Sequence, residues 1–121
     1  MLFKSFDNPS DDTMSQADKL SAFMNKVALA TKDDLSIGET VDGLLRNTME
    51  ELGEYAAALT IESGRKNKNL KESSQQEAID VIICALSLFY ASGGKNKTLV
   101  EYGAKKLDKW RKRIDDSNRI K

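Results

Sequence analysis

Two short groups of acidic residues in this sequence have a spacing that suits cation binding. The stretch MEELGEYAAAL carries Glu50, Glu51 and Glu54, and the later stretch QEAIDVIICALSLFY carries Glu77 and Asp80. Glu51 and Glu54 are three residues apart, as are Glu77 and Asp80, so each pair occupies neighbouring positions on one face of a helix. Carboxylates without histidine partners suit hard cations such as Mg²⁺ or Mn²⁺, with water filling the remaining positions.

The residues around these acids indicate which of them lie near the apolar face of a helix and could therefore come close together in the fold. At 100° per residue, Glu51 lies at the edge of the apolar stripe of its helix, Glu54 lies further out, and Glu50 points nearly opposite. Glu77 and Asp80 share a narrow polar face of a helix that is apolar on its other sides, and such a helix is usually buried. The four acids other than Glu50 could converge on a metal ion if a helix or a second subunit covers Glu54. By composition and periodicity alone, a solvated acidic surface remains the favoured interpretation.

The composition excludes several kinds of chemistry. The 121 residues include no histidine, which excludes histidine-based zinc sites, Ser-His-Asp triads and imidazole bases. Cys84 is the only cysteine. It cannot form a disulfide within the chain, and we interpret it as a small buried residue of a cytoplasmic protein. Basic and acidic residues number 19 each, so stable binding to nucleic acid is not expected. No apolar stretch reaches the roughly 18 residues of a membrane span.

Helical periodicity predicts an all-α fold with four helices. The chain has only one proline, Pro9, and long stretches without glycine, which favours helices. The expected helices span residues 14–31, 39–62, 71–92 and 97–116. No segment shows sustained alternation of apolar and polar residues, so no sheet is expected. We expect a flexible lead over residues 1–12 and a single four-helix, bundle-like domain over residues 13–121.

Two of the expected helices carry apolar stripes that we assign to the core. In the second helix the stripe is centred on Val41, Leu45, Leu52 and Leu59. In the fourth helix the candidates are Leu99, Tyr102, Leu107, Trp110 and Ile114. The fourth helix also carries basic residues on one side, which are candidates for binding the phosphates of a substrate: Lys106, Lys109 and Arg113. An ordinary solvated basic face is an equally good interpretation of that side.

Taken together, the acidic stretches resemble a known family. EELGE followed by EAID is similar to the EExxE…ExxD signature of the all-α nucleoside triphosphate pyrophosphohydrolases, the MazG-like family. The gap between the two stretches fits the range of that family. The segment GAKKLDKW resembles a fourth-helix segment of small MazG-like proteins. The resemblance covers residues 44–113, and the first helix contains no motif that matches.

This resemblance implies a metal-dependent enzyme. Glu51, Glu54, Glu77 and Asp80 match the metal ligands of the family, and Glu50 matches the first acid of the signature. The implied catalytic residues are Glu50 and Glu51. For Glu50 the alternatives are that it orients or activates water or that it is purely structural, and its position away from the apolar stripe favours the structural role unless a partner subunit covers that face. The implied reaction is the hydrolysis of a (deoxy)nucleoside triphosphate between its α- and β-phosphates, which gives a nucleoside monophosphate and pyrophosphate. The implied cofactor is Mg²⁺, with Mn²⁺ as a possible substitute.

The resemblance also implies a homodimer or homotetramer, because small members of the family usually have these states. Phe23 and Asn25 are implied near the nucleobase, because the first helix borders the site in relatives.

Two alternatives remain open from the sequence. One is a non-catalytic helical module that oligomerises or binds a protein partner, with its acids solvated. The other is a narrower enzyme, a base-specific dUTPase or dCTP pyrophosphatase.

Overall fold

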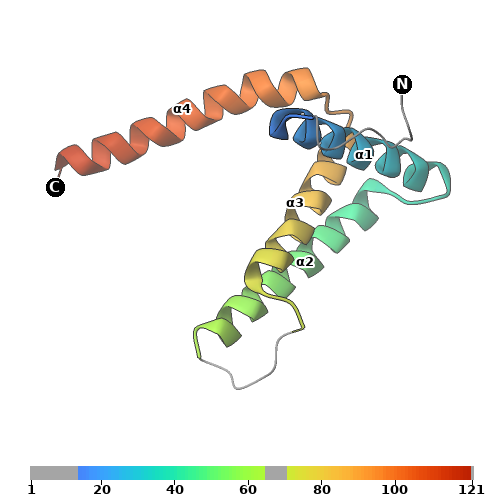
Figure 1. Cartoon of the computed structure of the whole chain (residues 1–121), viewed down its shortest axis with the longest axis horizontal. Coiled ribbons are helices and arrows are strands. Elements are labelled where there is room, and N and C mark those ends of the chain that lie inside the picture. Colours follow the sequence, from blue (N-terminus) through green and yellow to red (C-terminus); the bar gives the residue numbers. More distant parts are fainter. Residues whose placement is uncertain (1–13, 65–70, 121) are drawn as a thin grey trace. The chain divides into compact units, whose positions relative to one another are not determined.

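The fold was examined in a computed structural model, which describes residues 14–64 and 71–120, with side chains up to residue 118. Within these residues the chain forms four helices and no strand (Figure 1). The helices are α1 (Gln16–Ser36), α2 (Val41–Glu62), α3 (Ser74–Ala91) and α4 (Asn96–Ile120). The predicted all-α class is therefore confirmed. The lead predicted over residues 1–12 lies outside the described part.

Local capping residues explain where several of the helices begin and end. Ser15 caps α1, since its Oγ accepts a hydrogen bond from the Asp18 N–H at 3.0 Å, and Thr40 caps α2 through the Gly43 N–H at the same distance. Gly64 follows α2 with a positive φ of 80°, a conformation that favours glycine and is common after the end of a helix. The predicted end of the first helix was wrong by five residues. The polar run after Thr31 contains no glycine or proline before Gly38, so the helix continues to Ser36.

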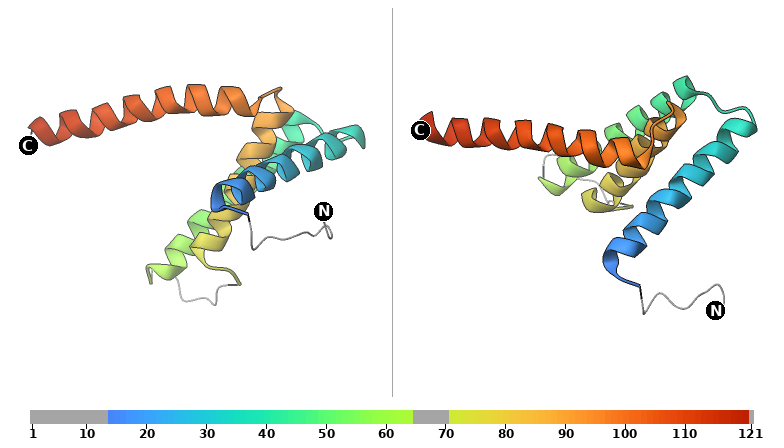
Figure 2. Two further views of the ribbon diagram at one scale, coloured as in Figure 1. Left: turned by 45° about the horizontal axis from the view of Figure 1, so that its top comes forward. Right: turned by 90° about the horizontal axis from the view of Figure 1, so that it is seen from above.

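The chain divides into two compact units, residues 1–91 and 92–121, which are described separately. In the first unit, α2 and α3 run antiparallel side by side, and α1 crosses the C-terminal part of α3 (Figures 1 and 2). A polar contact joins α1 to α3: the hydroxyls of Thr31 and Ser87 are 2.7 Å apart. Thr31 Oγ1 also donates to the Val27 carbonyl at 2.8 Å, which satisfies this buried hydroxyl.

The buried core of the described residues is small. Its apolar members are Val27, Leu44 and Ala58, and no large side chain is fully buried. The apolar stripe that the sequence assigns to the core on the second helix is instead exposed; Leu45 and Leu52, for example, are 45% and 54% exposed. The face of α2 that packs within the chain is the neighbouring one, which contains Leu44 and Ala58. Periodicity identifies an apolar face but does not tell which neighbour covers it.

The second unit consists mainly of α4, which has an apolar side and a basic side. The apolar side was predicted to be buried, yet Tyr102 and Trp110 are each 56% exposed. The Lys106 ammonium lies 5.1 Å from the centre of the Tyr102 ring, within the range of a cation–π contact.

Among the described residues, no single helix is long and apolar enough to cross a membrane. By length and composition, only α3 and α4 taken together as a bent pair satisfy those criteria.

Candidate metal centre

Three carboxylates from two helices meet on the inner side of the α2–α3 pair. Glu51 comes from the middle of α2, and Glu77 and Asp80 come from the first two turns of α3. Each offers a carboxylate oxygen, and these oxygens all lie within 4.8 Å of one another. All three residues are half-buried. The antiparallel packing thus brings together residues that are 29 positions apart in the chain, as the sequence prediction requires.

Glu51 contributes the clearest sign that this cluster suits a ligand. Its Oε2 atom is buried and has no hydrogen-bond partner in the described part of the chain. A buried carboxylate oxygen without a partner is costly, because it has lost water and gained nothing in return. Three converging carboxylates and no nitrogen or sulfur donor form a set that suits Mg²⁺ or Mn²⁺. The residues present therefore fit a hard divalent cation.

The pKa values of the cluster also indicate that ionised carboxylates are unfavourable in this position. Burial raises the pKa of Glu51 above its ordinary value, and the charges of Glu54, Asp80 and Glu77 raise it further. Burial likewise raises the pKa of Glu77, with Glu54, Glu72 and Asp80 adding to the effect. In both cases folding shifts the equilibrium toward the protonated carboxyl relative to the unfolded chain, because burial disfavours the charged form and the neighbouring negative charges repel it. A divalent cation would reverse this preference by favouring the ionised form.

These raised pKa values predict an unusual dependence of stability on pH. Between the ordinary carboxyl pKa and the raised values in the folded state, the folded protein binds more protons than the unfolded chain does, so stability falls as pH rises. With a chelator present, we expect the melting temperature to increase as the pH is lowered from neutral through the raised pKa values toward the ordinary carboxyl value of 4.5. Glu62 has a lowered pKa, because its carboxylate accepts a hydrogen bond from the Ser74 N–H at 2.8 Å, and it stays ionised over this window.

Differential scanning fluorimetry across this pH range would check the expectation. The Glu51→Gln variant is the matched comparison, because it removes one of the two groups with a raised pKa and should flatten the slope. A melting temperature that is constant or falls as the pH is lowered over this range in the wild type would contradict the crowding of charges in the cluster.

Glu54 and Glu50 lie outside the group of three. Glu54 is exposed, although it is close enough for its charge to raise the pKa of Glu51 and of Glu77. Glu50 is exposed, and the structure does not bring it into the cluster. Its role as a catalytic residue stays a prediction from the resemblance.

Cys84 lies one helical turn beyond Asp80 and is half-buried. Burial raises the pKa of its thiol, and the nearby charges of Glu51 and Asp80 raise it further. A thiol in this environment stays protonated at neutral pH and is a poor nucleophile. The observation agrees with the interpretation of Cys84 as a packing residue.

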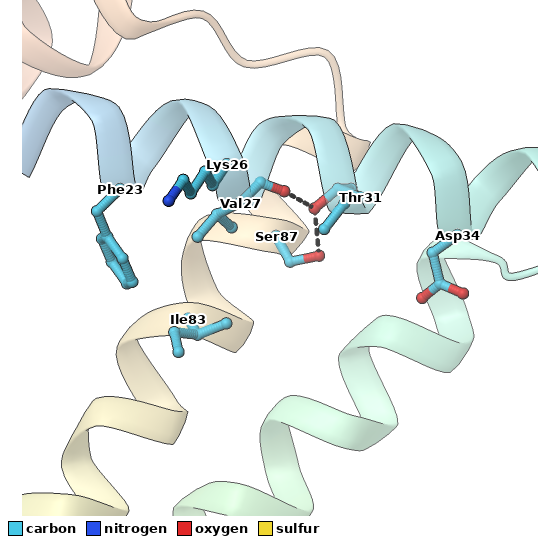
Figure 3. Close-up of a pocket in the computed structure, with 8 residues that line it drawn as sticks. Phe23, Lys26, Val27, Thr31, Asp34, Ile83 and Ser87 are labelled. Carbon is cyan, nitrogen blue, oxygen red and sulfur yellow. Dashed lines mark hydrogen bonds between the residues drawn. The ribbon is translucent and has the colours of Figure 1, made fainter. Parts of the chain in front are cut away.

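A groove of about 300 Å³ lies between α1 and α3 (Figure 3). Phe23 and Ile83 border it from the two helices, and the hydrogen-bonded pair Thr31 and Ser87 lines it as well. Of the two residues that the resemblance implies near a nucleobase, Phe23 lines this groove and Asn25 does not. In the sequence Ser87 shares the polar face of Asp80, but its contact with Thr31 could not be predicted, since the first helix was expected to end at Thr31.

The basic residues predicted to bind phosphate all lie on α4. Lys106, Lys109 and Arg113 are exposed and line one side of this helix together with Lys112 and Asp116. They share one surface, as the periodicity predicts. They belong to the second unit, so their part in a common site with the acids stays a prediction.

Comparisons with protein-family models, with curated proteins and with solved structures gave no match to this chain. The similarity to the MazG-like signature thus rests on the sequence motifs alone.

Proposed function

We propose that this protein is a metal-dependent hydrolase whose α2–α3 pair holds a divalent cation, Mg²⁺ or alternatively Mn²⁺. The observation that carries the proposal is the convergence of carboxylate oxygens of Glu51, Glu77 and Asp80 within 4.8 Å, with a buried Glu51 Oε2 that has no hydrogen-bond partner among the described residues. More particularly, we propose a nucleoside triphosphate pyrophosphohydrolase, because the order and spacing of the acids match the signature of that class. The products would be a nucleoside monophosphate and pyrophosphate.

In this proposal the chain's carboxylates have distinct roles. Asp80 and Glu77 hold the cation from α3, and Glu51 holds it from α2. Glu54 completes the set from the exposed border of the cluster. When bound, the cation would neutralise the phosphates and make a water molecule a better nucleophile. With no histidine in the chain, a carboxylate is the favoured proton acceptor for an attacking water; Glu51 and Glu50 are the candidates.

The rest of the substrate needs cations for its phosphates and a groove for its base. Lys106, Lys109 and Arg113 are the proposed phosphate contacts, since fixed positive charge stabilises a triphosphate. The groove that contains Phe23 is the candidate position for the base. Its Ser87 lies seven residues beyond Asp80 on nearly the same face of α3, which corresponds to about 10 Å along the helix. A nucleotide can extend over such a distance from its phosphates to its base.

A panel of ribo- and deoxyribonucleoside triphosphates would test the proposal directly. We expect release of pyrophosphate, rather than single phosphate, from at least one of them in the presence of Mg²⁺, and none in excess chelator. Mn²⁺ should replace Mg²⁺. If no nucleotide in the panel releases pyrophosphate, the enzyme is rejected and a non-catalytic helical module is favoured.

We further propose that the enzyme acts in the cytoplasm as a homodimer or homotetramer.

A further inference from the structure

The polar contact between α1 and α3 has a fixed hydrogen-bond direction, which restricts what the groove beside it can bind. Thr31 Oγ1 lies 2.8 Å from the Val27 carbonyl oxygen and 2.7 Å from Ser87 Oγ. A carbonyl oxygen can only accept, so the single Thr31 hydroxyl proton is donated to Val27. Ser87 must then be the donor between the two hydroxyls, because Thr31 has no second proton. The hydrogen bonds therefore run from Ser87 to Thr31 and from Thr31 to the Val27 carbonyl (Figure 3).

This direction leaves Ser87 with only its lone pairs for a ligand. Ser87 is half-buried and lines the groove. A hydroxyl that has already donated its proton can only accept a further hydrogen bond. A ligand atom that meets Ser87 must therefore carry a hydrogen. A carbonyl oxygen in the same position would face an oxygen with no proton between them, which is unfavourable.

The charged residues of the groove extend this pattern along α1. Asp34 is half-buried and lies three residues beyond Thr31, so the two residues are neighbours on the helix surface. Its carboxylate is a second acceptor on the Thr31 side of the groove. Lys26 lines the groove toward the Phe23 end, and its ammonium can only donate (Figure 3). The groove thus presents two acceptors toward one end and a donor toward the other.

Two of the nucleobases match this arrangement. Cytosine and adenine each carry an exocyclic amino group, which has two N–H donors, beside a ring nitrogen that accepts. Uracil and thymine have the opposite pattern at the same edge, a carbonyl oxygen beside a ring N–H. The apolar residues Phe23, Val27 and Ile83 provide surfaces for the faces of a flat ring, and the volume of about 300 Å³ is within the range of ligand pockets.

We infer that the groove between α1 and α3 selects cytosine or adenine over uracil and thymine, and that Ser87 determines this selectivity. Thr31 is a positioning residue, because it acts on the base by taking the Ser87 proton. The selectivity rests on the proposed function, which places the base of the substrate in this groove. It narrows the substrate from nucleoside triphosphates in general to those with an amino group at this edge of the base.

Comparison of nucleotides with one another tests this selectivity. CTP and UTP are a matched pair, since they have the same sugar, phosphates and ring size. We expect kcat/KM for pyrophosphate release from the better of CTP and ATP to exceed that for UTP by at least about tenfold, roughly the effect of one hydrogen bond. Equal values, or a preference for UTP, would overturn the selectivity and leave the pyrophosphohydrolase itself intact.

Binding measurements separate the selectivity from the enzymatic activity. If no nucleotide is hydrolysed, the proposed function fails, and calorimetric titration of CTP, ATP and UTP then decides the role of the groove. Affinity for CTP or ATP at least about tenfold higher than for UTP would support the selectivity. Equal affinities, or no binding, would overturn it.

Two variants test the hydrogen-bond direction. Ser87→Ala removes the acceptor and leaves Thr31 bonded to Val27, so it should fold and bring the CTP to UTP and ATP to UTP ratios of kcat/KM close to one. Thr31→Val returns the proton of Ser87, so kcat/KM for UTP should rise several-fold in absolute terms. Asp33→Asn, at an exposed position of α1, is the control and should keep the wild-type ratios. If both Ser87→Ala and Thr31→Val lower the rates with all nucleotides equally, their role is structural and the inference is wrong.

Discussion

Asp80→Asn is expected to abolish pyrophosphate release, with a loss of at least about 100-fold in kcat/KM. Asp80 offers an oxygen within 4.8 Å of those of Glu51 and Glu77, so it stands at the centre of the cation ligands. The amide has nearly the same shape as the carboxylate but lacks its charge. The loss should therefore reflect weaker metal binding and weaker charge stabilisation, not a change in packing. Initial rates of pyrophosphate release at saturating Mg²⁺ would measure it.

Asp33→Asn is the matched control for this experiment. Asp33 is an exposed residue of α1 and does not belong to the cluster, so its variant should retain wild-type activity. Far-ultraviolet circular dichroism of both variants should show unchanged helix content. If Asp80→Asn kept wild-type kcat/KM while folded, the acids of α3 would have no role in catalysis, and the proposed site would be wrong.

Glu51→Gln is expected to change stability in opposite directions with and without metal. In chelator, the substitution removes one of the crowded charges, so the melting temperature should rise by a few degrees near pH 7.5. With Mg²⁺, the wild type should gain about 2.7 kcal/mol at a concentration 100 times Kd. That gain corresponds to an increase of about 10 °C for a chain of this size. The variant should lose most of this gain, because it offers one fewer ionised ligand.

Thermal melts of both proteins in chelator and across a Mg²⁺ titration would measure this reversal. Glu101→Gln, at an exposed position of α4, should resemble the wild type in both conditions. A merely structural glutamate would behave differently, since its replacement would lower the melting temperature in chelator and leave the response to Mg²⁺ intact. That pattern would contradict the assignment of Glu51 as a metal ligand.

Helical periodicity was sufficient to predict the four helices. The spacing of the acids shows only which of them share a helix face, and on that basis alone a solvated surface was the favoured interpretation. Their convergence across two helices was expected from the family resemblance, with Glu54 as a fourth member, which the structure leaves outside the group of three. The prediction ended α1 too early because the polar residues after Thr31 suggest a bend. The helix continues to Ser36 because this run contains no glycine or proline. The contact between Thr31 and Ser87 was not predictable either, since it depends on how α1 crosses α3 and joins residues 56 positions apart.

The buried face of α2 was the least predictable feature. The strongest apolar stripe of the helix was assigned to the core, and the structure exposes it while burying Leu44 and Ala58. Periodicity shows only which side of a helix is apolar. It contains no information on whether another part of the same chain or another molecule covers that face. Glu51 was placed at the edge of the expected core, and it lies closer to the interior than that prediction implied.

In the language of energy landscapes, α2 is a locally frustrated helix. Turning it by about 100° would exchange Glu51 for Leu52 against α3, which would bury a leucine and release a crowded carboxylate to water. Minimally frustrated sequences avoid such a conflict, and natural proteins tend to retain it where a site requires it. The retained orientation is the one that a bound cation would stabilise, because the cation would compensate the crowded charge of Glu51. The rotational setting of α2 is therefore the feature in which metal binding and helix packing are linked.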